Sequence, residues 1–193
     1  MIELQKYANT ENWFNYKGFY KWIVSHENFK IFIEVGVWKG HSISYLAELL
    51  INRKNIKIYA VDLFDDTYLL DYYGLKGSPQ EGHLWEIYNY NLKLKNVRHI
   101  IQDIKMLSWE AAKKFKDNSV DFVFIDADHS YEAVKKDISA WWPKIKKGGI
   151  ISGHDYKQEA YPGVEKAVIE FFGSVNEFKY DIGDAFCWYK EKI

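Results

Sequence analysis

The sequence is poor in cysteine and proline and contains no long apolar run. Its single cysteine, Cys187, has no partner in the chain for a disulfide, which is typical of a protein from a reducing compartment. No window approaches the roughly 18 apolar residues of a membrane span, and residues 1–10 (MIELQKYANT) lack the apolar core of a signal peptide. We therefore expect a cytoplasmic protein without a membrane partner.

The sequence also lacks an excess of positive charge. Its formal net charge is −1, and its Lys and Arg residues are scattered along the chain, so the basic face of a nucleic-acid-binding protein is not expected. Aromatic residues are plentiful instead, at 18% of the chain. They could thicken the core, line a pocket for a small molecule or form the contact of a homodimer, and composition does not decide between these roles.

Short apolar runs alternate with amphipathic stretches, which predicts parallel strands joined by helices. The expected strands are residues 31–35, 58–61, 97–101, 120–125 and 149–152, with two more near 175–180 and 184–189. The expected helices are residues 41–53, 81–94, 107–116, 130–142 and 162–173. We therefore expect one α/β domain over residues 1–193. It comprises an aromatic helical cover (1–28) and a Rossmann-like core (29–193), a doubly wound, mostly parallel seven-stranded sheet with helices on both faces.

Glycines follow the first expected strand, within the segment EVGVWKGHS at residues 34–42. A strand, a glycine turn and a helix start form the context of a nucleotide-binding loop, because glycine lets the backbone approach a ligand closely. Glycines at such a turn also serve plain packing. Asp62 ends the second expected strand, where an acid can accept hydrogen bonds from both ribose hydroxyls of an adenosine-type ligand. The alternative is that Asp62 caps the following turn.

A second group of polar residues follows the fourth and fifth expected strands. Asp126, Asp128 and His129 come after the fourth strand, and His154 and Asp155 come after the fifth. These side chains should converge, because the carboxyl ends of strands in an open sheet form its ligand crevice. Clusters rich in oxygen donors suit Mg²⁺ or Mn²⁺, which can bind a substrate oxygen and lower its pKa.

From about Ile31 to Phe172 the sequence resembles the class I S-adenosylmethionine-dependent methyltransferases, in particular the small family of macrocin-type and catechol-type O-methyltransferases. The resemblance is carried by E-x-G-x-x-x-G-x-S at 34–42, VD at 61–62, VDFVFIDADHSYE at 120–132 and WPKIKKGGIISGHDY at 142–156. It implies that S-adenosyl-L-methionine is the cofactor. The implied contacts are Glu34, Gly36, Gly40 and Ser42 for the methionine part, Asp62 for the ribose, Asp103 for the adenine, and Asp126 at the end of the fourth strand.

The same resemblance implies a divalent metal held by the aspartate that ends the fourth strand and by a pair of acids after the fifth. These positions are Asp126, His154 and Asp155. His154 departs from the acidic pattern, and an imidazole is a poorer ligand for Mg²⁺ than for Mn²⁺, Fe²⁺ or Zn²⁺. Ligation by His154, a supporting role behind the ligands and contact with the substrate all stay open.

Family members place a general base two or three residues beyond the strand-ending aspartate, where this chain has Asp128 and His129. We prefer His129, because imidazole titrates near neutrality. Asp128 is the alternative base, and a third interpretation is that Asp128 or Ser130 only caps the next helix. The expected reaction is in-line methyl transfer to a hydroxyl of a small molecule: a sugar, a natural product or a phenol.

The acceptor pocket has candidate residues in the aromatic side chains of the stretch 65–90, together with Trp13 and Tyr16. The segment 65–82 exceeds the usual length of a connection in such folds, and long loops are often functional. Two rival functions stay open. One is a same-fold enzyme with hydroxylase-like or aminopropyl-transferring chemistry, and the other is a non-catalytic nucleotide-binding module.

Overall fold

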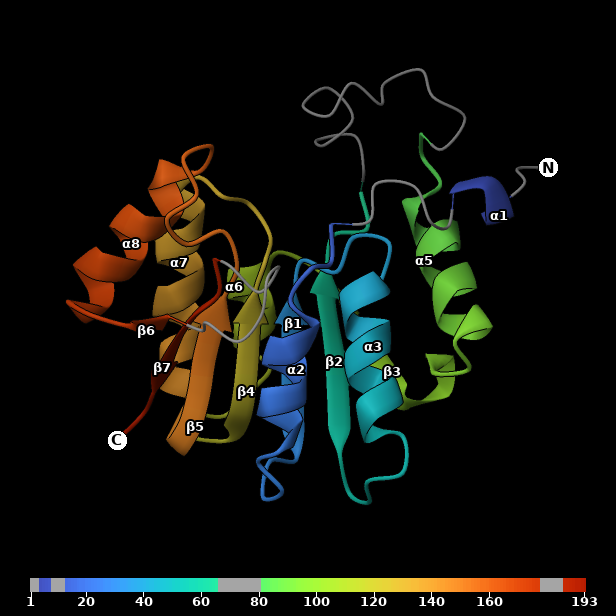
Figure 1. The fold of residues 1–193 in the computed structure, drawn as a ribbon, viewed down its shortest axis with the longest axis horizontal. Helices are drawn as coiled ribbons and strands as arrows, with labels where there is room; N and C mark the ends of the chain where they lie inside the picture. The colour runs from blue at the N-terminus through green and yellow to red at the C-terminus, as the bar shows by residue number, and fades with distance from the viewer. Residues whose placement is uncertain (1–3, 8–12, 66–80, 178–185) are drawn as a thin grey trace.

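A twisted seven-stranded sheet forms the centre of the structure, a computed structural model that describes residues 4–7, 13–65, 81–177 and 186–193 (Figure 1). The strand order is β3-β2-β1-β4-β5-β7-β6. The strands are β1 (Ile31–Val35), β2 (Lys57–Asp62), β3 (Ile101–Lys105), β4 (Val120–Ile125), β5 (Ile145–Gly153), β6 (Asn176–Glu177) and β7 (Trp188–Glu191). Strands β1 to β5 pair in parallel, whereas β7 is antiparallel to both of its neighbours. The predicted Rossmann-like fold class is thus confirmed.

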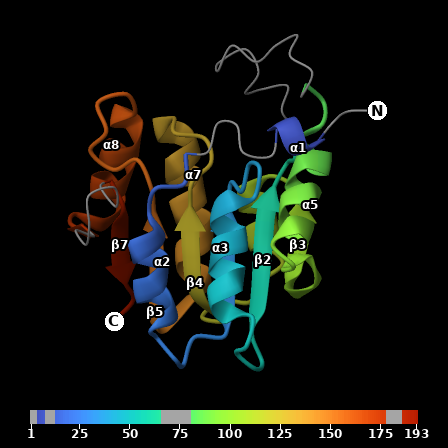
Figure 2. The ribbon, with the colours of Figure 1, turned by 45° about the vertical axis from the view of Figure 1, so that its right-hand side comes forward.

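Helices cover both faces of this sheet, as Figure 2 shows for the face turned toward the viewer. That face carries α2 (Lys17–Val24), α3 (His41–Leu50) and α5 (Leu84–Leu94). The opposite face carries α6 (Ser108–Ala112), α7 (Tyr131–Trp141) and α8 (Pro162–Phe172). A short helix, α1 (Leu4–Tyr7), lies beside α5, and two 3₁₀ turns are η1 (Arg98–Ile100) and η2 (Trp142–Lys144).

Strand β4 (VDFVFI) has an almost continuous apolar sequence, interrupted only by Asp121. All six of its residues are buried, and alternate side chains enter different halves of the core. Phe122 and Phe124 pack with α2 and α3, whereas Val123 and Ile125 pack with α7 and α8. A strand covered on both faces has no solvent side, so its sequence need not alternate.

Several predicted elements differ from the structure. β5 begins four residues before the strand expected at 149–152, β7 covers Trp188–Glu191 where a strand was expected near 184–189, and α6 is shorter than the helix expected at 107–116. The strand expected at 97–101 begins only at Ile101, because Asn96 adopts a positive φ of 56° after α5 and residues 98–100 then form η1. The aromatic N-terminal segment is helical only in part, since residues 13–16 are not helical and α2 begins at Lys17. Residues 66–80, most of the long loop, lie outside the described part. None of the helices that the structure describes has the length and apolarity needed to cross a membrane.

Candidate active site

The carboxyl ends of β1, β2, β4 and β5 lie side by side at one end of the sheet, and most of the predicted site residues lie there. Glu34, near the end of β1, is fully buried. The Ser42 hydroxyl donates a hydrogen bond to its Oε1, and the Tyr20 hydroxyl donates to its Oε2 at 2.7 Å. Burial raises the pKa of Glu34 to about 8, although both hydroxyls oppose the shift. Glu34 and Ser42, which we predicted as cofactor contacts, thus bind each other in the structure.

The turn after β1 requires glycine at two positions, because each has a positive φ and no room for a Cβ atom. Gly36 has a φ of +80°, and a Cβ atom there would lie 2.1 Å from the backbone oxygen of Asp126. Gly40 has a φ of +79° and faces Tyr88 and Leu92, whose side-chain carbons would lie 2.8 and 2.7 Å from a Cβ. The turn therefore holds the first loop against β4 on one side and α5 on the other.

Asp62 organises this loop through its carboxylate. Its Oδ2 accepts hydrogen bonds from the backbone N–H groups of Val37 (2.8 Å) and Trp38 (3.1 Å), and its Oδ1 accepts from Phe64 N–H (2.8 Å). Burial raises the pKa of Asp62, against the opposing effect of these amides. The capping role that we considered for Asp62 is thus present. Its contact with a ribose stays a prediction.

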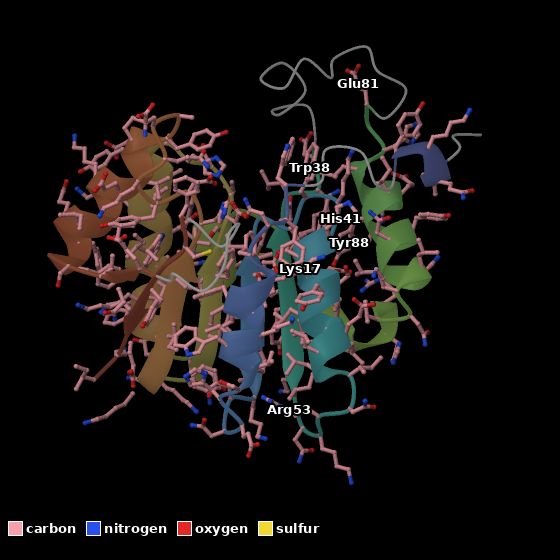
Figure 3. The ribbon with its side chains drawn as sticks, viewed as in Figure 1. Lys17, Trp38, His41, Arg53, Glu81 and Tyr88 are labelled. Atoms are coloured by element: carbon pink, nitrogen blue, oxygen red, sulfur yellow. The ribbon has the colours of Figure 1, made fainter. Side chains whose placement is uncertain are left out.

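Trp38 lies at the top of the loop with strained backbone. Its φ is +47°, a region that bulky residues rarely adopt and that is often found at functional sites. Its ring stacks on that of Trp13 with the centroids 5.5 Å apart. Figure 3 shows Trp38, His41 and Tyr88 near the ends of the strand arrows, with Glu81 on the chain that leads into α5.

Asp103 is tied to its own surroundings. Tyr88 donates a hydrogen bond to its Oδ1 at 2.6 Å, and the Arg98 guanidinium forms an ion pair with its Oδ2. Asp103 pairs with Ala60, two residues before Asp62 at the strand end. Two donors already satisfy this carboxylate below the strand ends, so its predicted contact with adenine receives no support from the geometry and stays a prediction.

The residues after β4 and β5 converge as the sequence predicted. One potential ligand atom from each of Asp126, His154 and Asp155 lies within 4.8 Å of the others. His154 and Asp155 are buried, and Asp155 has a positive φ of 57°. His129 joins them, because its Nε2 lies 2.7 Å from Asp155 Oδ2 and 3.5 Å from Asp126 Oδ1. The cluster therefore contains two carboxylates and two imidazoles.

The charges in this cluster compensate one another. Burial alone would lower the pKa of His129, but the carboxylates of Asp126 and Asp155 outweigh it and raise that pKa to about 10. The pKa of His154 is raised for the same reason, again against the effect of burial. Burial alone would raise the pKa of Asp155, but the two imidazoles hold it below its usual range. At neutral pH the protonated His129 imidazole thus supplies positive charge beside the carboxylates of Asp126 and Asp155.

Asp128 lies apart from the cluster. Its side chain is exposed and its Oδ1 accepts a hydrogen bond from Ser130 N–H at 2.7 Å. Ser130 is the N-cap of α7, and its hydroxyl accepts a hydrogen bond from the backbone N–H of Ala133. The helix-start interpretation therefore accounts for both Asp128 and Ser130, and the geometry favours His129 over Asp128 as the candidate base.

Three residues at the cluster were not recognised in these roles from the sequence. Asn15 Oδ1 lies 3.0 Å from His154 Nε2, and the Tyr16 hydroxyl donates to Asp126 Oδ2 at 3.0 Å. Tyr161, just before α8, stacks on the His129 ring with the centroids 4.3 Å apart. Tyr16 was a candidate for the acceptor pocket, but only 2% of it is exposed, so it lies beneath the cluster.

The parallel sheet with its antiparallel β7, and the polar side chains at its strand ends, match the Rossmann-like methyltransferase fold. Residues 33–156 match the family model of a methyltransferase domain. The chain therefore belongs to this methyltransferase family.

A curated relative is the uncharacterized protein R132 from Acanthamoeba polyphaga mimivirus, which is 28% identical over 162 residues. The alignment covers 78% of this chain and 65% of R132, so the chain spans about two thirds of that protein's length.

Solved structures share the fold at low sequence identity. The O-methyltransferase TomG from Streptomyces achromogenes, solved in complex with SAM, has a TM-score of 0.63 and 11% identity over 91% of this chain and 79% of TomG. An rRNA methylase from Streptococcus thermophilus has a TM-score of 0.60 and 11% identity, over 91% of this chain and 95% of the methylase.

Proposed function

We propose that this chain is an S-adenosylmethionine-dependent methyltransferase that methylates a hydroxyl of a small molecule with the help of a divalent metal. The observation that carries the proposal is the convergence of Asp126, His154 and Asp155 beside His129, at the same strand ends as the first loop. Membership of the methyltransferase family supports the cofactor. The adjacent base and metal ligands support a hydroxyl acceptor, because a hydroxyl must lose its proton to become a strong nucleophile.

The donor set fits a divalent metal. Asp126 and Asp155 offer carboxylate oxygens and His154 offers a ring nitrogen, a mixture that suits Mn²⁺, Fe²⁺ or Zn²⁺ better than Mg²⁺. When bound, the metal would supply positive charge that lowers the pKa of the acceptor hydroxyl. Asp155 is held in the left-handed region of backbone space, so its carboxylate is placed by the turn as well as by its neighbours.

In this proposal His129 takes the hydroxyl proton at Nε2. That role requires a neutral imidazole, and the charges of Asp126 and Asp155 oppose it by raising the pKa of His129 to about 10. His129 can therefore act as a base only when the negative charges of Asp126 and Asp155 are neutralised. The acceptor oxygen attacks the methyl carbon as the carbon–sulfur bond breaks, which yields a methyl ether and S-adenosylhomocysteine.

Calorimetry with S-adenosylhomocysteine tests the cofactor, and it separates a methyltransferase from the same-fold hydroxylase-like alternative. Transfer of labelled methyl from S-adenosylmethionine to a panel of nucleotide sugars, glycosides and catechols then tests the acceptor class. EDTA should abolish turnover, and Mn²⁺ should restore it at least as well as Mg²⁺, because His154 provides a nitrogen ligand. Full activity in EDTA would remove the metal from the proposal, and absence of S-adenosylhomocysteine binding would overturn it.

A further inference from the structure

Residues 13–16 bring the N-terminal part of the chain to the candidate metal cluster. Within this stretch, Asn15 contacts His154 and Tyr16 contacts Asp126. Two consecutive residues thus each contact a different candidate ligand, and each contact joins residues more than 100 positions apart in the sequence.

Asn15 determines which ring nitrogen of His154 is available. Its Oδ1 is an acceptor, so His154 Nε2 carries a proton and donates to it. The other ring nitrogen, Nδ1, lies 3.3 Å from Asp155 Oδ2 and so faces the cluster. The His154 ring is 8% exposed and lies against the Tyr16 ring, with the centroids 4.8 Å apart. Packing and hydrogen bonding therefore both hold Nδ1 toward Asp155.

Tyr16 fixes the carboxylate of Asp126 in a similar way. Its ring is buried among Tyr20, Phe124 and other aromatic residues, so the hydroxyl has a fixed position. That hydroxyl donates a hydrogen bond to Asp126 Oδ2, while Asp126 Oδ1 faces His129. The rotation of the carboxylate is therefore set by a residue outside the cluster.

We infer that Asn15 and Tyr16 position the metal ligands, and that docking of segment 13–16 is thereby coupled to metal binding. This inference rests on the metal site of the proposed function. Partners that orient metal ligands commonly contribute 10- to 100-fold to metal affinity. Because such coupling is reciprocal, bound metal should stabilise the docked segment by the factor that the segment adds to metal affinity.

Titration of the whole protein with Co²⁺, followed by visible absorption, measures affinity and nitrogen ligation without any turnover. Asn15→Leu removes the acceptor at similar volume, so we expect Co²⁺ affinity to fall about 10- to 100-fold. Asn15→Asp keeps an acceptor for Nε2–H and should stay within a factor of a few of the wild type. Tyr16→Phe should weaken binding by up to about tenfold.

Tyr20→Phe is the matched control. It also removes a buried hydroxyl, but that hydroxyl donates to Glu34 and touches no candidate metal ligand, so Co²⁺ affinity should not change. Hydrogen exchange of peptides covering 13–20 should slow when Co²⁺ binds to the wild type, and the slowing should be reduced in Asn15→Leu. An unchanged far-UV circular dichroism spectrum in each variant would show that the fold is intact.

The outcomes separate this inference from the proposed function. If the wild type binds Co²⁺ and the Asn15→Leu and Tyr16→Phe variants bind it equally well, the positioning role is wrong while the metal site stands. If the wild type binds no Co²⁺ but binds S-adenosylhomocysteine, both the metal and this inference are rejected, and the cofactor assignment survives.

Discussion

The carboxyl end of the sheet has two halves, one at β1 and β2 and one at β4 and β5, and their acidic residues have different hydrogen-bond partners. At the ends of β1 and β2, Glu34 and Asp62 receive hydrogen bonds from neutral donors, namely hydroxyls and backbone amides. At the ends of β4 and β5, Asp126 and Asp155 face the imidazole of His129. Burial raises the pKa of both acids in the first half, whereas the pKa of Asp155 is lowered in the second.

This difference shows that an acid at a strand end does not by itself indicate a metal. Neutral donors satisfy the acids of the first half and fix a loop, so that half suits a ligand that makes hydrogen bonds. Paired acids with protonatable partners form a site in which a cation can replace protons. Variants of the two halves should therefore separate cofactor binding from turnover.

The largest expected effect lies in the β4–β5 half. His129→Ala should lower kcat by roughly 10²- to 10⁴-fold, the usual contribution of a positioned general base, while S-adenosylhomocysteine affinity stays nearly constant. Asp128→Asn is the control and should cost much less, because Asp128 is exposed and bonded to Ser130. The measurement is kcat against pH with one accepted substrate. An unaltered profile in His129→Ala would move the role of base to the metal or to Asp128.

In the β1–β2 half, Asp62→Ala should weaken S-adenosylhomocysteine binding by at least about tenfold, because the predicted acceptor for the ribose hydroxyls is lost. The loop amides of Val37 and Trp38 lose their acceptor as well. Asp62→Asn retains one acceptor oxygen, so its S-adenosylhomocysteine affinity should lie between those of Asp62→Ala and the wild type. Calorimetry measures both, and Co²⁺ affinity should not change. Wild-type affinity in Asp62→Ala would contradict the ribose assignment.

A smaller effect is expected at Tyr161, which stacks on His129. Tyr161→Ala should lower kcat severalfold with little change in KM, because the imidazole loses the ring that limits its rotation. Tyr161→Phe keeps the ring and should restore kcat. A loss in Tyr161→Phe as large as in Tyr161→Ala would assign the effect to the hydroxyl.

The smallest effect concerns stability against pH. Folding raises the pKa of Glu34 from 4.5 to about 8, so the folded state binds a proton more tightly than the unfolded state. This contribution to stability is complete below about pH 4.5 and is lost as the pH rises toward 8. The slope is at most about 1.4 kcal/mol per pH unit. Denaturant unfolding from pH 5 to 8 should show it, and Glu34→Gln should flatten it. Equal slopes in both proteins would exclude Glu34 as the source.

The sequence predicted the frame of the fold well. The bounds of β1 and β4 match, because each is a mainly apolar run with a single acid, ended by a polar or glycine residue. The helix at 162–173 was marked by Pro162 and Gly173, and α8 ends one residue before that glycine. By contrast, η1 depends on Asn96, whose positive φ is not apparent from an apolar pattern.

The candidate site was predictable where strand ends alone place the residues. The grouping of Asp126, His154 and Asp155 follows from two neighbouring parallel strands. The contacts of Asn15 and Tyr16 could not be predicted, because they depend on how the N-terminal segment crosses the sheet. Local sequence carries no signal for a contact across 139 positions, the separation of Asn15 and His154.

The close approach of Gly36 to the backbone of Asp126 connects the two halves of the site. Gly36 N–H bonds to Val61 C=O, and Asp126 N–H bonds to Val35 C=O, so three strand ends are linked directly. No side chain larger than a hydrogen atom fits at this junction. In the proposed reaction, the distance between a cofactor bound at the β1–β2 half and an acceptor bound at the β4–β5 half would therefore be set by the sheet itself.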